Sequence, residues 1–155
     1  MGAVCALVGA LTGSWVAISS IGIGYGVFAV AAALAGLLCG AGAWWLVVVR
    51  AGRHTPWRGA LAGALAAVVG HYLCWYLVLV SAFVAQAWSK TSPAHGQEVS
   101  GPIASIGWAI APALWSLLLL GWATIPSGML LGAWLGTHQR TVAEARGVRV
   151  NPAPP

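Results

Sequence analysis

The chain has 155 residues, of which 60% are hydrophobic and only 6% are charged, whereas a typical soluble domain is roughly 25% charged. A water-soluble domain of this length cannot bury that much apolar surface, so lipid is the expected solvent for most of the chain. Seven basic residues against two acids give a net charge of +5. Because the basic residues stand in short connections beside apolar runs, the charge argues against nucleic acid as a partner.

The sequence predicts an all-α integral membrane protein with a bundle of four transmembrane helices. The first two apolar segments cover residues 3–19 and 25–49, with a turn rich in Ser and Gly at 20–24. At about 1.5 Å of rise per residue, the first segment is barely long enough to cross the bilayer. Three spans are therefore the alternative, with a single span within the first 49 residues.

The third predicted span covers residues 57–87. Thr55 as N-cap and Pro56 in the first turn predict its start. The run from Gly59 to Ala87 contains neither acid nor base, which indicates a membrane-spanning helix rather than a buried soluble one. His71 lies near its middle, and an ionisable residue inside a span is by default a functional candidate.

The fourth predicted span covers residues 103–135 and carries Pro112 and Pro126. Each proline removes a backbone donor, so we expect a kink around each of them. Residues 1–136 are thus predicted to form the transmembrane domain. Residues 137–155 are predicted to form a basic, Pro-rich cytoplasmic tail, helical as far as Ala145.

The distribution of basic residues predicts the orientation. Four spans with cytoplasmic N- and C-termini put six of the seven basic residues inside and one, Lys90, outside. The six are Arg50, Arg53, Arg58, Arg140, Arg146 and Arg149. This positive-inside pattern and the short loops favour a bacterial inner (cytoplasmic) membrane.

Glycines recur at four-residue spacing, which places them on one helix face where two backbones can approach closely. We therefore expect this GxxxG pattern to mark helix-packing faces, within the bundle or against another chain. The predicted packing residues are Gly36, Gly40, Gly59, Gly63, Gly128, Gly132 and Gly136.

Tryptophan is abundant, with ten copies. Several, among them Trp44 and Trp45, lie near predicted interfaces, where an amphipathic ring serves as an anchor. Trp108, Trp115 and Trp122 repeat every seven residues and are predicted to form a ridge along one face of the fourth helix. Packing against lipid or a neighbouring subunit is the favoured interpretation of this ridge, and a flat ligand is the alternative.

His71 has two interpretations. Ala67, His71 and Trp75 follow at i+4 spacing, so the small Ala67 leaves room for a planar ring, and a neutral imidazole there can ligate the metal of a heme or chlorophyll. These residues resemble the Ala-xxx-His pattern of bacterial light-harvesting polypeptides, which implies a tetrapyrrole at His71. The favoured alternative is a neutral histidine hydrogen-bonded to a carbonyl of a neighbouring helix or to a Ser or Tyr.

The sequence lacks the residue patterns that catalytic sites, metal sites and carboxylate-coupled transport require. The two acids, Glu98 and Glu144, fall in the outer loop and the tail, so no predicted span contains a carboxylate. No HExxH, phosphate loop or GxSxG is present, and Cys5, Cys39 and Cys74 form no cluster with histidine. We therefore expect no catalytic residue, no metal site and no enzymatic activity.

The leading functional hypothesis is a non-catalytic accessory or structural subunit of a larger membrane protein complex. Its expected partners are the lipid bilayer and unlike membrane subunits, and it needs no cofactor. One alternative is a membrane subunit that binds heme or chlorophyll through His71. Another is a small channel or facilitator, lined by the helix breaks at Pro112 and Pro126.

Overall fold

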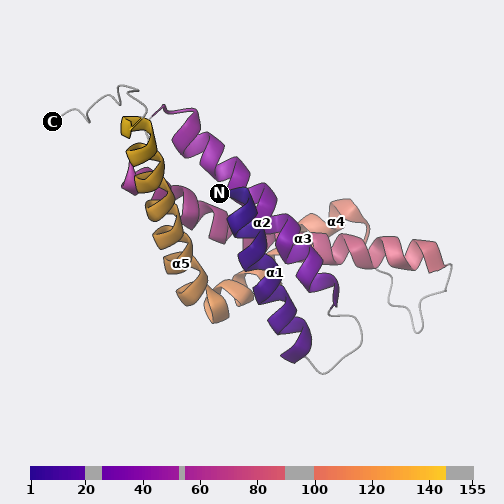
Figure 1. Cartoon of the computed structure of the whole chain (residues 1–155). Coiled ribbons are helices and arrows are strands. Elements are labelled where there is room, and N and C mark those ends of the chain that lie inside the picture. Colours follow the sequence, from indigo (N-terminus) through magenta and orange to yellow (C-terminus); the bar gives the residue numbers. More distant parts are fainter. Residues whose placement is uncertain (20–25, 53–54, 90–99, 146–155) are drawn as a thin grey trace.

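The computed structural model describes residues 1–19, 26–52, 55–89 and 100–145, and these residues are almost entirely helical (Figure 1). The predicted turn at 20–24, the outer loop at 90–99 and the end of the tail lie outside the described residues. In chain order, the elements are α1 (Gly2–Ser19), α2 (Gly26–Trp44), the π-helix η1 (Trp45–Val49), α3 (Pro56–Ser89), α4 (Pro102–Trp108) and α5 (Ile110–Ala145).

Three stretches of helix are long and apolar enough to cross a membrane, namely Gly26–Val49, Pro56–Ser89 and Ile110–Val142. They correspond to the second, third and fourth predicted spans. The first predicted span is helical as α1, but its apolar part, Gly2–Val16, is a shorter helix. The predicted all-helical fold is therefore confirmed for the described residues, with three candidate membrane spans.

A tight turn joins α2 to α3. The π-helix η1 closes with a hydrogen bond from the Arg50 amide to the Trp45 carbonyl, and Gly52 then adopts a φ of +60°, which a side chain would disfavour. The hydroxyl of Thr55 accepts a hydrogen bond from the Arg58 amide at 3.4 Å, so Thr55 caps α3 as predicted. The Arg58 guanidinium reaches back to donate to the Val47 carbonyl at 3.2 Å.

The helices pack as two pairs, α1 with α2 and α3 with α5, and α2 also packs on α3 (Figure 1). Along α3 and α5, Gly59 lies against Gly132 and Gly63 against Gly128, so residue numbers rise on one helix as they fall on the other. The pair is therefore antiparallel. The same relation holds for α1 and α2, where Gly9 lies against Ala32 and Gly13 against Phe28.

The interior is built from small residues. Seven of the nine buried hydrophobic residues are alanines, and the large apolar side chains mostly point outward, as expected for a protein whose solvent is lipid. The exception is a cluster of Trp44, Val48 and Ala62, against which Met1 and Leu135 pack. This cluster brings the N-terminus, the end of α2 and the last turns of α5 to the same end of the bundle.

The two prolines of the fourth predicted span behave differently. Pro126 lies inside α5, and the ribbon of α5 changes direction along its length (Figure 1). The kink expected around Pro112 takes the form of a break at Ala109, between α4 and α5. A proline ring clashes with the carbonyl four residues earlier, here that of Trp108, so the distortion precedes Pro112, which itself sits in the first turn of α5. Beyond residue 136, α5 continues to Ala145 without interruption.

Candidate functional site

All seven predicted packing glycines lie at contacts between helices of this chain. Gly59 and Gly63 of α3 meet Gly132 and Gly128 of α5, backbone against backbone, and Gly136 lies against Thr55. A Cβ atom on Gly128 would stand 2.7 Å from the Gly63 carbonyl oxygen, closer than any real Cβ contact. We call this contact the α3–α5 glycine seam (Gly59, Gly63, Gly128, Gly132 and Gly136).

The second set of glycines joins α1 to α2. Gly36 lies against the Cys5 carbonyl, and a Cβ atom on Gly40 would stand 2.8 Å from the Cys5 Sγ. From α1, Gly9 and Gly13 complete this α1–α2 glycine seam. Because both seams are occupied within the chain, they are not available as docking faces for a partner.

His71 joins α3 to two turns of α5. Its Nδ1 lies 2.9 Å from the Ser116 hydroxyl, and its Nε2 lies 3.0 Å from the Thr124 hydroxyl. Ser116 also donates to the Ala113 carbonyl at 2.9 Å, and Thr124 to the Leu120 carbonyl at 3.1 Å. The imidazole is half-buried. Both ring nitrogens thus have hydroxyl partners, which matches the second interpretation of His71, although the partners come from α5 and not from nearby tyrosines.

Ala67 and Trp75, the two residues that flank His71 in the predicted tetrapyrrole pattern, both face neighbouring helices. Ala67 faces α5, since a Cβ atom on Gly128 would lie 3.6 Å from the Ala67 Cβ. One turn further along α3, the Trp75 ring packs edge-on against Phe28 of α2, with ring centroids 5.0 Å apart. A metal at His71 would have to displace one of the two hydroxyls. In the described part of the chain, no three His, Cys, Asp or Glu side chains gather as a metal site.

The tryptophan ridge (Trp108, Trp115 and Trp122) stands on the outer surface. These three side chains are 67%, 65% and 78% exposed. Trp108 is the last residue of α4, and the other two belong to α5, so the ridge runs across the break at Ala109 rather than along one continuous helix. The described residues of the chain thus leave all three rings largely uncovered.

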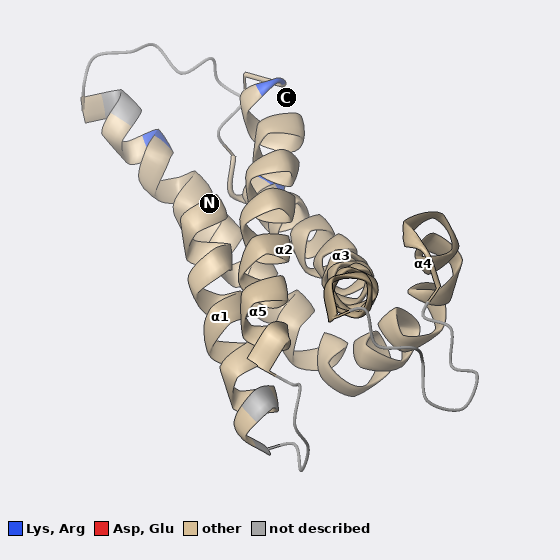
Figure 2. Ribbon diagram, turned by 90° about the vertical axis from the view of Figure 1, so that its right-hand side faces the viewer, with Lys and Arg blue, Asp and Glu red and all other residues tan. Residues whose placement is uncertain are grey.

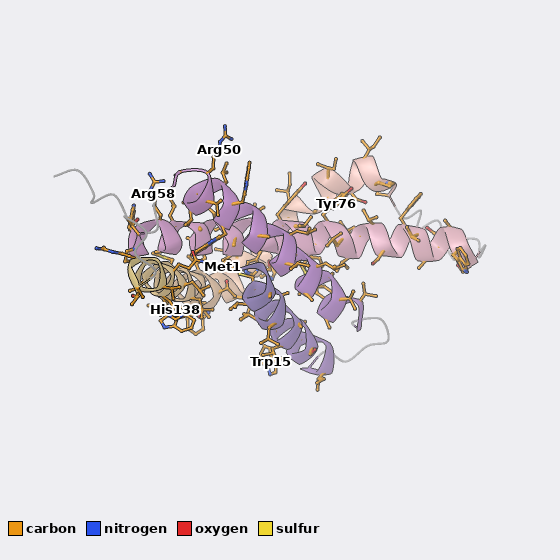
Figure 3. All side chains as sticks on the ribbon, turned by 45° about the horizontal axis from the view of Figure 1, so that its top comes forward. Met1, Trp15, Arg50, Arg58, Tyr76 and His138 are labelled. Atoms are coloured by element: carbon orange, nitrogen blue, oxygen red, sulfur yellow. The ribbon has the colours of Figure 1, made fainter. Side chains whose placement is uncertain are left out.

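The other tryptophans divide into two groups. The anchoring role predicted for Trp44 does not fit its environment, because its side chain is only 7% exposed and belongs to the buried cluster with Val48. Trp45, Trp57, Trp88 and Trp134 are exposed. On α1, Trp15 points away from the rest of the bundle (Figure 3).

An apolar groove of about 630 Å³ lies between α2 and the second half of α3. It is lined by Val27, Val30, Ala31 and Leu34 of α2 and by Leu77, Val80, Ser81, Val84, Ala85 and Trp88 of α3. Its one polar side chain is Ser81, whose hydroxyl donates to the Val78 carbonyl at 2.7 Å. The lining of the groove is therefore almost entirely apolar.

The basic residues that the structure describes, Arg50, Arg58 and Arg140, lie toward one end of the bundle (Figure 2). It is the end where Met1 packs beside Trp44 and Val48. Cys5, Cys39 and Cys74 are free thiols.

Sequence reasoning missed Ser116 and Thr124 as partners of His71, and it missed the groove. The hydroxyls lie 45 and 53 positions from His71, so no local spacing links them to it. The signal that was available is that both carry hydroxyl groups within a predominantly apolar span. The groove depends on how α2 and α3 diverge, which residue types do not specify. Comparisons of the chain with protein-family models, curated proteins and solved structures gave no match.

Proposed function

We propose that this protein is a non-catalytic accessory subunit of a larger membrane complex, and that the tryptophan ridge contacts an unlike membrane subunit. The observation that carries the proposal is the exposure of all three ridge tryptophans. Because the glycine seams are used within the chain, the surface left for partners is one of large apolar side chains.

The depth of the ridge favours a protein partner over lipid anchoring. Tryptophan prefers the membrane–water interfaces. Trp115 and Trp122 lie seven residues apart on α5, about 10 Å along the helix axis, and Trp108 belongs to the separate helix α4. We do not expect rings at such different positions all to serve as anchors at one interface. If a helix of a neighbouring subunit packs on the ridge, the central ring, Trp115, contacts protein instead of lipid acyl chains.

The groove between α2 and α3 adds a second contact surface. Its ten lining residues come from both helices and are almost all apolar. All buried residues of α3 lie between Gly59 and Ala66, so the second half of this helix has none. This half of α3 also extends past the other long helices (Figure 1). A partner helix or an acyl chain in the groove would cover it.

We further propose four spans, with both termini on the cytoplasmic side of a bacterial inner membrane. The gathering of Arg50, Arg58 and Arg140 toward one end supports that orientation under the positive-inside rule. Because α1 is antiparallel to α2 along its glycine seam, a membrane-crossing α1 would start at this basic end.

The two alternatives receive less support. Heme or chlorophyll ligation at His71 would break a hydrogen bond to Ser116 or Thr124. A channel or facilitator would use the bend of α5 near Pro126, but bends also occur in plainly packed bundles.

The test is co-purification from the native membrane with the ridge altered. We expect Trp115→Leu combined with Trp122→Leu to lose most of the bound unlike subunits, while helix content and yield stay unchanged, because both side chains face outward. Trp15→Leu on α1 is the matched control, since Trp15 is equally exposed at 63% but lies outside the ridge. Full retention of unlike subunits by the ridge variant would contradict the proposed contact.

A further inference from the structure

The hydrogen bonds around His71 outnumber the protons of its neutral form. Four contacts join the imidazole, the two hydroxyls and the two carbonyls of Ala113 and Leu120. A neutral imidazole carries one N–H, and Ser116 and Thr124 carry one O–H each. Three protons therefore serve four contacts, so one contact lacks a donor in the neutral state.

Protonation completes the set. In the imidazolium both ring nitrogens are donors, so Nδ1–H donates to Ser116 and Nε2–H donates to Thr124. Each hydroxyl then keeps its own donation, Ser116 to Ala113 and Thr124 to Leu120. All four contacts have a proton, and the two at the ring are charge-assisted, the stronger kind.

In the neutral state one hydroxyl must turn. If Nδ1 carries the proton, the Thr124 hydroxyl has to donate to Nε2 and give up Leu120. If Nε2 carries it, Ser116 has to donate to Nδ1 and give up Ala113. The two helix carbonyls tolerate this loss because each is also positioned as a backbone acceptor in α5. The site thus holds both forms of the imidazole without moving a helix.

The helices around His71 place few other ionisable groups near it. α4 has no titratable side chain, and α5 has none between Ile110 and Gly136. On α3 the neighbours are Tyr72, whose hydroxyl donates to the Ile106 carbonyl at 2.9 Å, together with Cys74 and Tyr76. α2 has only Cys39, whose titratable neighbour is Cys5 on α1. No carboxylate of the described residues neutralises a charge here, so the hydroxyls and the carbonyls behind them are what stabilise it.

We propose that His71, Ser116 and Thr124 form a proton-binding site inside the helical bundle. Proton uptake restores the fourth hydrogen bond, from the Ser116 or Thr124 hydroxyl to its carbonyl in α5, and makes both contacts between α3 and α5 charge-assisted. The ligand is the proton itself, so the site needs no metal and no organic cofactor. The proposal does not depend on the accessory role, because the site lies within one chain.

The test is ¹⁵N nuclear magnetic resonance of the full chain, labelled at histidine and placed in lipid bilayers. The His71 signals are identified by their loss in His71→Phe. Between about pH 8 and about pH 4, we expect both ring nitrogens of His71 to become protonated and to show hydrogen-bonded shifts. A His71 ring that stays neutral across this range would overturn the proposal.

Removing the hydroxyls tests their part in the site. Ser116→Ala combined with Thr124→Val should require a proton concentration at least roughly tenfold higher to protonate His71, because two hydrogen bonds to a charged group are lost. Ser127→Ala is the control, since its hydroxyl lies on α5 but donates only to the Ala123 carbonyl. A double variant that titrates like the wild type would also overturn the proposal. Should the double variant fail to fold, the wild-type titration decides alone.

Discussion

Replacing Gly63 by alanine is expected to lower the free energy of unfolding by roughly 1–3 kcal/mol, the usual cost of overpacking a well-packed contact. A Cβ atom at this position would collide with the carbonyl group of Gly128. Because the opposing atoms belong to a helix backbone, no side-chain rotation can relieve the collision, and α3 and α5 must separate. The van der Waals contact between the two backbones, which drives association of helices in lipid, is lost with it.

The matched control for this variant is Gly70→Ala on the same helix. A Cβ atom at Gly70 meets no other atom within 4 Å, and alanine is the better helix former by about 1 kcal/mol. We therefore expect Gly70→Ala to be as stable as the wild type or slightly more stable. The measurement is unfolding in detergent followed by circular dichroism. Equal stability of the Gly63 and Gly70 variants would contradict the backbone contact between α3 and α5.

The second large effect is expected at the α1–α2 glycine seam. Gly36→Ala places a Cβ atom against the Cys5 carbonyl, so α1 should detach from α2 at a cost of similar size. Since 1.4 kcal/mol corresponds to a factor of ten in an equilibrium, we expect Cys5 to be alkylated about tenfold faster by an apolar thiol reagent. The rate is measured in a background of Cys39→Ala and Cys74→Ala, so that Cys5 is the only thiol.

Gly42→Ala provides the control on α2, because a Cβ atom there meets nothing within 4 Å. Its Cys5 alkylation rate should equal that of the background protein. If Gly36→Ala left the rate unchanged as well, α1 would not be held by the contact between Gly36 and Cys5.

The helices were predictable because their signals are local. The apolar run of α3 and its cap at Thr55 can be read from neighbouring residues, and the structure shows both. The glycine spacing indicates which helix faces allow close packing, but not which helix packs against each of them. That Gly63 meets Gly128, a residue more than sixty positions away in the sequence, depends on the antiparallel alignment of α3 and α5.

Where the structure departs from expectation, the cause is tertiary packing. Trp44 lies near a predicted span end, as an interfacial anchor would, but Ala62 of α3 packs against it and its side chain is buried. The distortion expected around Pro112 is present, and it falls at Ala109 because the proline ring acts on the turn before it. The network of His71 depends on α5 lying along α3, which no spacing within either helix shows.

The native mass of the protein, extracted from its own membrane in a mild detergent, tests the accessory role most directly. The account predicts a mass that requires unlike polypeptides in addition to this chain, with those polypeptides lost when Trp115 and Trp122 are replaced by leucine. A mass that corresponds to this chain alone, or to a symmetric oligomer of it, would contradict the account.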